Sequence, residues 1–424
     1  MLQLSTIRQN PESIVERLAL RGLDAAAAIQ ELLKADESNR KLRFDLEQQQ
    51  AKANQLAGEI GQLFKSGQKD QAELKRQESA DLKDSIKNLE QELASSDEQV
   101  KALLIALPNA PQLDVPKGKS ADDNLCVLEW GSKPQLHSQA KPHWELASEY
   151  GIIDFELGVK ITGAGFPVYK GKGAILQRAL IQFFLNEAGK EGYTEMQVPH
   201  LVNADSGYGT GQLPDKEGQM YHAVLDDLYL IPTAEVPVTN LYRNTLLDHS
   251  ELPIKNTGYT PCFRREAGSY GAHVRGLNRL HQFDKVEIVQ IVKPQDSDAT
   301  LESMQQYVQG LLQKLELPYR LLLLCGGDMG FTSAKTYDLE VWSAAQERWL
   351  ECSSVSNFET FQTNRLKCRY RNEDGKTELA HSLNGSALAL PRIVAALLEN
   401  NQDETGIRIP SVLVPYTGFD RIEA

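Results

Sequence analysis

The sequence lacks the long apolar segments and the regular cysteine spacings that mark membrane-spanning and disulfide-rich proteins. No run approaches the roughly 18 consecutive apolar residues that a bilayer-crossing helix needs. The five cysteines form no Cys-x-x-Cys pair and have no histidine nearby at metal-ligand spacing. We therefore predict a cytoplasmic protein with no membrane contact, no disulfide framework and no structural zinc site.

The usual glycine-rich nucleotide motifs are also missing. There is no G-x-x-x-x-G-K loop, and the glycine clusters at residues 162–167 and 207–212 do not fit G-x-G-x-x-G between a strand and a helix. A dinucleotide-binding oxidoreductase is therefore disfavoured. The net charge of −13 argues against a uniformly basic surface, so any polyanionic partner must be bound by local clusters of arginine and lysine.

The N-terminal quarter carries a heptad pattern. Apolar residues recur in alternating steps of three and four over residues 32–63, and again over residues 82–107 after a polar break. The pattern predicts an antiparallel helical hairpin whose first seam is about 48 Å long. Asn39 and Gln49 fall on the seam, where we expect them to fix the register. An isolated hairpin of this kind is most often a scaffold or a dimerisation rod.

The remainder of the chain mixes short β-rich runs with helical stretches in no regular βαβ order. We expect an α+β fold with an antiparallel sheet and flanking helices. The proline-containing region after the hairpin shows no periodicity. This organisation predicts a helical domain over residues 1–110, a linker over residues 111–124 and a second domain over residues 125–424.

Paired charges stand inside a predicted β-hairpin. A strand over residues 260–266 would place Arg264 and Glu266 on one face, and the returning strand would present Phe283 and Glu287. An arginine fork suits carboxylate or phosphate oxygens, an aromatic ring suits a planar base, and a glutamate accepts from amines or hydroxyls. Each residue alone is ordinarily a surface ion pair or core filling, but the combination indicates a nucleotide bound beside an amino acid.

Three ordered segments then resemble the motifs of class II aminoacyl-tRNA synthetases. GYTEMQVPHLV around Pro199 is similar to motif 1, CFRREAGS with RLHQFDKVE to motif 2, and LNGSALALPRIVAALLEN to motif 3. With the N-terminal arm, they resemble the bacterial-type seryl-tRNA synthetases over the whole chain. The resemblance implies a six- or seven-stranded antiparallel sheet, a homodimer formed through motif 1, and activation of L-serine by ATP with Mg²⁺. The seryl group then passes to tRNA(Ser), and the resemblance leaves tRNA(Sec) open as a second acceptor.

The resemblance also implies a role for individual residues. The catalytic residues would be Arg264, Glu351 and Arg392. The serine pocket would contain Thr233, Ala234, Glu235, Arg264, Glu287 and Ser386. ATP would contact Arg264, Arg265, Glu266, Phe283, Glu351, Cys352, Ser353, Ser354 and Arg392. Magnesium would be held by Glu351 and Ser354. Phe283 and Arg392 would sandwich the adenine, a stacking arrangement that fits their chemistry.

The same resemblance implies that the helical arm cradles the long variable arm of tRNA(Ser) by its shape and backbone. Residues 267–279 form a loop rich in glycine and arginine, which we expect to close over a polyphosphate or to touch the acceptor end of an RNA. The alternative is a non-catalytic tRNA-binding coiled-coil protein derived from a synthetase. It would be signalled by loss of Arg264, Glu287, Glu351 or Arg392, and all four are present.

Overall fold

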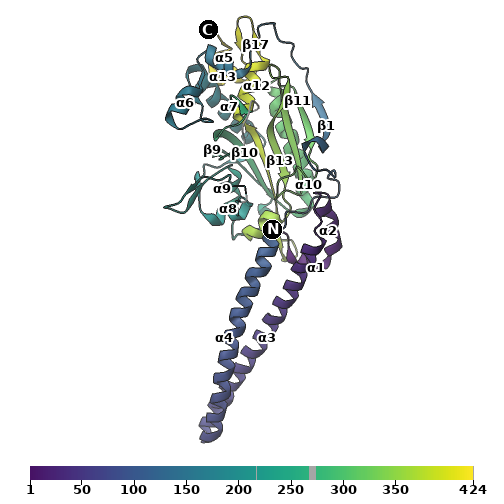
Figure 1. Cartoon of the computed structure of the whole chain (residues 1–424), viewed down its shortest axis with the longest axis vertical. Helices are drawn as coiled ribbons and strands as arrows, with labels where there is room; N and C mark the ends of the chain where they lie inside the picture. The colour runs from purple at the N-terminus through teal and green to yellow at the C-terminus, as the bar shows by residue number, and fades with distance from the viewer. Residues whose placement is uncertain (216, 267–273, 424) are drawn as a thin grey trace. The chain divides into compact units, whose positions relative to one another are not determined.

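The computed structural model describes residues 1–215, 217–266 and 274–423 (Figure 1). The chain divides into two compact units. The first contains residues 1–19 and 23–108, and the second contains residues 20–22 and 109–424. In the described ranges, no helix is long and apolar enough to cross a membrane.

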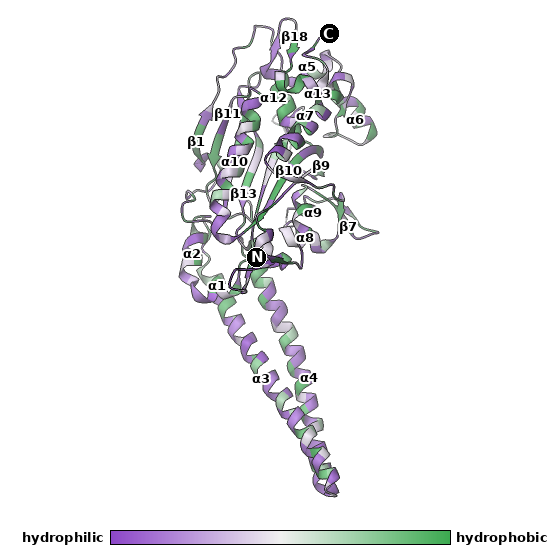
Figure 2. Ribbon diagram, turned by 180° about the vertical axis from the view of Figure 1, so that it is seen from behind, coloured by the Kyte–Doolittle hydropathy of each residue, from purple (hydrophilic) through white to green (hydrophobic). Residues whose placement is uncertain are grey.

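The first unit is the predicted helical hairpin. Its helices are α1 (Leu4–Gln9), α2 (Pro11–Ala19), α3 (Ala26–Lys65) and α4 (Lys69–Ala106). The helices α3 and α4 run antiparallel, joined by a turn of three residues, and hydrophobic residues recur at intervals along both (Figure 2). The heptad pattern therefore predicted both long helices and their pairing correctly.

A polar contact sets the register between α3 and α4. The Asn39 side-chain amide donates to Asp97 Oδ1 at 2.7 Å and to Ser96 Oγ at 3.2 Å. The seam around it is apolar, with Leu32 and Leu46 buried. The side-chain oxygen of Gln49 is also buried but has no hydrogen-bond partner in the described part of the chain. A register role is therefore supported for Asn39 and not for Gln49.

The second unit is built on a large sheet, which has eight strands in the described residues. In spatial order they are β1 (Leu125–Trp130), β11 (Tyr319–Leu323), β12 (Lys335–Ser343), β13 (Arg348–Asn357), β16 (His381–Ala389), β10 (Gln282–Val292), β9 (Ile254–Phe263) and β4 (Thr194–Glu195). The first seven pair antiparallel, and only the two-residue β4 pairs parallel, with β9. The expected antiparallel sheet is thus present.

Three helices cover one face of this sheet. They are α7 (Gly171–Lys190), α10 (Ser297–Lys314) and α12 (Leu390–Asn400), and their apolar sides share one core cluster with Val286 and Ile288 of β10. Because side chains alternate along a strand, Glu287 points to the opposite face. That face carries the short helix α9 (Glu235–Asn240), whose Val238 packs with Val289. The candidate site lies on this second face.

We expect Asn39→Ala to loosen the middle of the arm, because Asp97 then loses its seam donor. A hydrogen bond to a charged group contributes about 1.5–3 kcal/mol. Amide hydrogen exchange of the intact chain should therefore accelerate at least about tenfold in α3 near position 39. Arg43→Ala is the matched control, since Arg43 pairs with the same carboxylate at 3.0 Å but its side chain is half exposed, whereas Asn39 is buried. Equal acceleration in the two variants would contradict the assigned register role.

Candidate active site

The centre of the site is the hairpin of β9 and β10. The register pairs Phe283 with Cys262 and Glu287 with Gly258. Phe283 and Glu287 are therefore on the same face of β10, while Val286 enters the helix-covered core. This alternation on the returning strand confirms the sequence prediction.

The first strand of the hairpin ends earlier than predicted. The sequence predicts a strand through Glu266, but β9 stops at Phe263, so this prediction is wrong. The amide of Arg265 donates to the carbonyl of Gln219 at 2.9 Å, and Glu266 has a φ of 47°. A left-handed residue cannot continue a strand. Arg264 and Glu266 consequently belong to the segment after the strand and do not share a strand face.

Arg264 nevertheless lies between a main-chain carbonyl and an aromatic ring of the site. Its Nε donates to the carbonyl oxygen of Pro232 at 3.3 Å. Its guanidinium carbon is 5.2 Å from the centre of the Phe283 ring, which is cation–π distance. The arginine is therefore oriented by a main-chain carbonyl and a ring, neither of which neutralises its charge.

Residues expected to bind serine surround one buried carboxylate. Glu287 is 1% exposed. Its Oε2 accepts from Thr233 Oγ1 at 3.1 Å and forms an ion pair with Lys285, and its Oε1 accepts from Asn384 Nδ2 at 2.5 Å. A buried charge is tolerated only where such partners offset the loss of water. The result is a charged acceptor in an otherwise buried pocket.

Lys285 and Asn384 are residues of the site to which the sequence assigned no role. Strand alternation predicted Lys285 on the same face as Glu287, two residues away, but gave no sign of their ion pair. Asn384 stands two residues before Ser386, which lies directly opposite Glu287 on β16. No signal in the sequence indicated that β16 pairs with β10 in this register.

The other predicted serine residues are also buried. Glu235, at the start of α9, accepts from Gln362 Nε2 at 2.6 Å. Burial raises the pKa of Glu235 to about 7. Ser386 is 7% exposed and opposite Glu287, which places its hydroxyl at the same pocket. Ala234 is fully buried in an apolar cluster, so its side chain contributes only packing.

A β-bulge in β13 brings Glu351 and Ser354 to one face. The register pairs Glu340 with Glu351 and Asp338 with Ser354, and Cys352 is the extra residue between them. Residues three apart on a regular strand face opposite sides, but one inserted residue shifts the alternation. The two residues expected to hold magnesium therefore lie on the same face.

Cys352 and Ser353 direct their side chains into structural contacts. The Cys352 thiol donates to the carbonyl of Leu339 at 3.3 Å, and burial raises the pKa of this thiol well above its ordinary value. The Ser353 hydroxyl donates to the carbonyl of Ser386 at 2.6 Å. Both side chains are engaged in the sheet, which leaves their main chain as the part able to meet a nucleotide.

Asp338 is a carboxylate that sequence reasoning did not single out. Its side chain is hydrogen-bonded by Ser354, yet Oδ1 is buried with no partner in the described part of the chain. Burial and the nearby charge of Glu351 raise the pKa of Asp338 well above its ordinary value. Carboxylate and hydroxyl oxygens are the ligands that Mg²⁺ prefers. The described residues include no group of three His, Cys, Asp or Glu side chains able to hold a metal.

Arg392 connects three parts of the site. It lies in the first turn of α12 directly after Pro391, where the sequence predicts a proline to fit. Its Nε donates to the carbonyl of Asn278 at 3.2 Å, and its Nη1 donates to the carbonyl of Glu351 at 2.5 Å. The Glu351 carboxylate is farther away, at 3.7 Å. The motif 2 segment, β13 and α12 thus converge on one guanidinium.

The two remaining ATP candidates lie at the edge of the site. The Arg265 side chain is exposed, and Glu266 forms an ion pair with Arg279. The loop predicted to close over a polyphosphate includes residues 267–273, which lie outside the described residues. Of its predicted basic residues, Arg275 and Arg279 are described.

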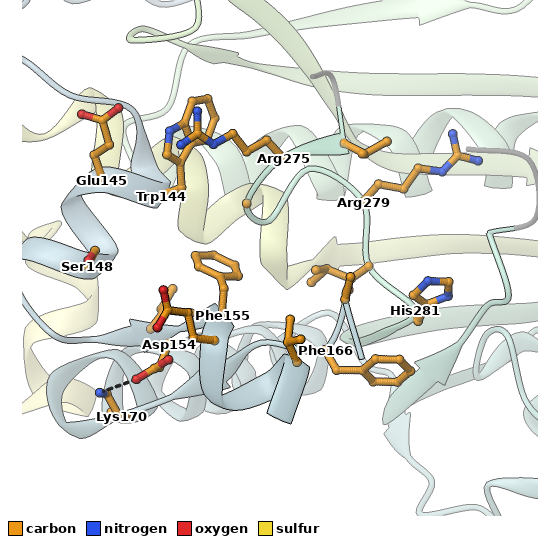
Figure 3. Close-up of a pocket in the computed structure, with 18 of the residues that line it drawn as sticks. Trp144, Glu145, Ser148, Asp154, Phe155, Phe166, Lys170, Arg275, Arg279 and His281 are labelled. Carbon is orange, nitrogen blue, oxygen red and sulfur yellow. Dashed lines mark hydrogen bonds and ion pairs between the residues drawn. The ribbon is translucent and has the colours of Figure 1, made fainter. Parts of the chain in front are cut away.

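A cavity of about 850 Å³ adjoins Glu266 (Figure 3). Its aromatic and basic lining includes Trp144, Phe155, Phe166, Arg275, Arg279 and His281. The Arg275 guanidinium lies 4.9 Å from a Trp144 ring, and Phe166 stacks on His281 at 5.4 Å. Of the predicted site residues, Glu266 alone lines the cavity. It therefore borders the proposed nucleotide residues and does not contain the serine pocket.

Comparison with known families matches both units of the chain. The family described as "Seryl-tRNA synthetase N-terminal domain" matches residues 1–111, and "tRNA synthetase class II core domain (G, H, P, S and T)" matches residues 222–401. The serine–tRNA ligase of Salinibacter ruber is 51% identical over 426 residues, covering 100% of both chains. That of Carboxydothermus hydrogenoformans is 48% identical over 425 residues, covering 100% of this chain and 99% of the relative.

Solved structures are similar over the same extent. The seryl-tRNA synthetase of Pyrococcus horikoshii, complexed with ATP, is 34% identical with a TM-score of 0.93 and covers 100% of this chain and 99% of its own. The cytoplasmic serine–tRNA ligase of Naegleria fowleri, complexed with AMP, is 25% identical with a TM-score of 0.86, covering 98% and 96%. These full-length similarities favour the enzyme over a non-catalytic derivative. The chain belongs to the seryl-tRNA synthetase family and is a class II serine–tRNA ligase.

Proposed function

We propose that this ligase activates L-serine at the sheet face formed by β10, β13 and β16, and that it then charges tRNA(Ser). The observation that carries the site assignment is the buried Glu287 carboxylate, ringed by Thr233, Lys285 and Asn384. Arg264 lies nearby, and no carboxylate in the described part of the chain forms an ion pair with it. An acceptor for the serine ammonium and hydroxyl thus stands beside a donor for its carboxylate.

In the first step, a serine carboxylate oxygen attacks the α-phosphorus of ATP. The bond from this phosphorus to its bridging oxygen breaks, pyrophosphate leaves, and seryl-adenylate stays bound. The step requires no side-chain nucleophile or general base, so the protein contributes positioning and positive charge. We assign those contributions to Arg264 and Arg392, and we assign Phe283 to the adenine ring.

Selectivity for serine follows from unpaired polar groups. An amino acid without the hydroxyl would leave buried acceptors of the pocket unsatisfied, which costs several kilocalories per mole when such groups are sealed from water. Thr233, Glu287 and Ser386 supply these groups. Threonine, which retains the hydroxyl, must be excluded by the shape of the pocket.

Magnesium fits the face shared by Glu351 and Ser354. The fit rests on the oxygen donors of both residues and on the buried Asp338 Oδ1, which has no protein partner in the described ranges. When bound, Mg²⁺ would offset the negative charge of the phosphates. Glu351 and Ser354 would hold the ion, and Asp338 would orient Ser354 through their hydrogen bond.

In the second step, a ribose hydroxyl at the acceptor end of the tRNA attacks the adenylate carbonyl. The carbon–oxygen bond to the phosphate breaks, AMP leaves, and the hydroxyl proton is released. We assign tRNA binding to residues 1–110, with residues 111–124 as the linker and residues 125–424 as the catalytic domain. The same arm would also accept tRNA(Sec) as a second substrate for charging, since RNA helices are recognised mainly by shape.

We also infer a homodimer formed through motif 1 and a cytoplasmic location. Motif 1 includes β5 (Leu201–Val202), where the Leu201 side chain is 46% exposed, and Leu225 of the neighbouring turn is fully exposed. Exposed apolar side chains of this kind are typical of surfaces that a partner covers. The cytoplasmic location is supported by the relative from Naegleria fowleri, which is described as cytoplasmic.

We expect Glu287→Gln to raise the KM for serine about 100-fold, because the isosteric amide removes the charge that faces the ammonium. The KM for ATP should stay within about twofold, as measured by serine-dependent exchange of pyrophosphate into ATP. Glu235→Gln is the comparison. The pKa of Glu235 is raised to about 7, so below that pH its carboxyl is neutral and resembles the amide. Its defect should therefore shrink from pH 8 to pH 6, and a pH-independent defect would contradict this assignment.

We expect Asp338→Asn to raise the Mg²⁺ concentration for half-maximal pyrophosphate exchange about tenfold, as loss of an outer-shell partner typically does. The KM for serine should not change. Glu340→Gln is the matched control on the same strand face, since Glu340 is paired with Arg320. If the control shifts the Mg²⁺ requirement as much as Asp338→Asn does, the assigned metal site is wrong.

We expect deletion of residues 32–103, with a short glycine-rich connection in their place, to abolish tRNA charging. Pyrophosphate exchange should be retained within about twofold, because the residues assigned to adenylation all lie in the second unit. Thermal unfolding of the deleted chain serves as the control for its folding. Equal loss of both activities in a folded variant would overturn the assignment of tRNA binding to the arm.

A further inference from the structure

A buried carboxylate and a buried imidazole lie behind the site, and the reaction as described uses neither. Glu399, in the last turn of α12, and His143, the first residue of α5 (His143–Glu149), both have fully buried side chains. His143 Nδ1 lies 2.7 Å from Glu399 Oε1, and the His143 amide donates to the same oxygen at 3.0 Å. Ser343 donates to the other carboxylate oxygen. Burial raises the pKa of Glu399, but these hydrogen bonds outweigh it and hold the pKa below its ordinary value.

The remaining ring nitrogen of His143 fixes its tautomer. His143 Nε2 lies 2.8 Å from the backbone nitrogen of Leu277, whose N–H can only donate. Nε2 is therefore unprotonated, and Nδ1 carries the hydrogen that it donates to Glu399. The imidazole thus links the end of α12 to the main chain at the end of the motif 2 loop.

Gly276 allows the main chain to approach this ring. Its φ is +67°, and a Cβ at this position would lie 2.3 Å from His143 Nε2. A side chain at position 276 would be both strained and in collision with the imidazole. The close contact between the main chain and the imidazole therefore requires both Gly276 and His143.

The segment held by His143 carries two contacts of the active site. The carbonyl of Asn278 accepts from Arg392 Nε at 3.2 Å, and its side chain donates to Gln346 Oε1 at 2.9 Å. Gln346 in turn donates to Glu399 at 3.0 Å. The next residue, Arg279, pairs with Glu266. A displacement of Leu277 would therefore move the contacts of both Arg392 and Glu266, the two residues nearby that are assigned to ATP.

We propose that His143 is a positioning residue for ATP: its imidazole, anchored by Glu399, fixes residues 276–279 and through the Asn278 carbonyl sets the orientation of Arg392. The proposal rests on the assignment of Arg392 to ATP under the proposed function. In the described contacts, His143 bonds to none of the residues assigned to serine, including Glu287. Its effect is therefore specific to ATP and leaves serine binding unchanged.

Two amide substitutions separate the two ring nitrogens. In His143→Asn, the side-chain NH₂ replaces the Nδ1 donor to Glu399, but the Leu277 amide loses its acceptor. In His143→Gln, the longer side chain places an oxygen near the former Nε2, so the Leu277 contact is retained. We expect the KM for ATP in pyrophosphate exchange to rise about tenfold in His143→Asn and less than about threefold in His143→Gln. The KM for serine should stay within about twofold in both.

Gly276→Ala tests the same contact from the other side and keeps the test valid if His143→Asn does not fold. It should also raise the KM for ATP about tenfold without changing the KM for serine. Asn400→Ala is the stability control: in the described contacts the Asn400 side chain bonds to the main chain of Trp342 and Ala344 and not to the network around His143, so this substitution should lower the melting temperature and leave the KM for ATP unchanged. If His143 has only a structural role, His143→Asn and Gly276→Ala will also lower the melting temperature and leave the KM for ATP unchanged. That result would overturn the proposal.

Arg392→Gln distinguishes the failure of this proposal from the failure of the function on which it rests. If Arg392→Gln raises the KM for ATP while His143→Asn and Gly276→Ala do not, only the positioning role of His143 is wrong. If Arg392→Gln leaves the KM for ATP unchanged, the assignment of Arg392 itself is wrong. Equal defects in His143→Asn and His143→Gln would also contradict the proposal, because the Leu277 contact would then not decide the effect.

Discussion

The buried charge of Glu287 is the constraint on which the rest of the catalytic unit depends. Removing a carboxylate from water costs several kilocalories per mole unless nearby donors replace the water. The donors come from three places in the chain: Thr233 before α9, Lys285 on the same strand, and Asn384 on β16. Asn384 reaches Glu287 because β16 pairs with β10, so the partners of the charge depend on the strand order. The cost of burial also favours a polar ligand for this pocket, as the proposed function requires, since unfilled hydrogen-bonding capacity is costly there.

The two arginines of the site are held in a different way. Arg264 donates to the carbonyl of Pro232, and Arg392 donates to the carbonyls of Asn278 and Glu351. Main-chain carbonyls orient a guanidinium through their dipoles but do not neutralise it, whereas a carboxylate would do both. Among the described residues, Arg392 forms an ion pair with the carboxylate of Glu351, at 3.7 Å. In the described residues neither guanidinium has a carboxylate closer than 3.7 Å, which fits the proposed role of both arginines beside the phosphates of ATP.

Much of the fold was readable from the sequence because it depends on local periodicity. The heptads over residues 32–63 and 82–107 predicted α3 and α4, and strand alternation placed Phe283 and Glu287 on one face. The errors and omissions concern features that local pattern does not determine. The end of β9 at Phe263 depends on the contact between Arg265 and Gln219, and the bulge at Cys352 is visible only in the pairing of β13 with β12. Without that bulge, Glu351 and Ser354 would face opposite sides, so their joint assignment rested on family resemblance and not on spacing.

The same distinction applies to the residues that orient the site. A motif names the side chains that meet the substrate, but Arg392 is oriented by main-chain oxygens whose positions depend on other residues. The Asn278 carbonyl is fixed by His143, Gln346 and Glu399, which lie in three separate regions of the sequence. No spacing rule connects them, because the connection passes through a backbone amide and a glycine that permits close approach. A guanidinium that is held by carbonyl oxygens can be positioned only as accurately as the main chain that carries those oxygens. The position of Arg392 therefore depends on buried polar contacts outside the motifs.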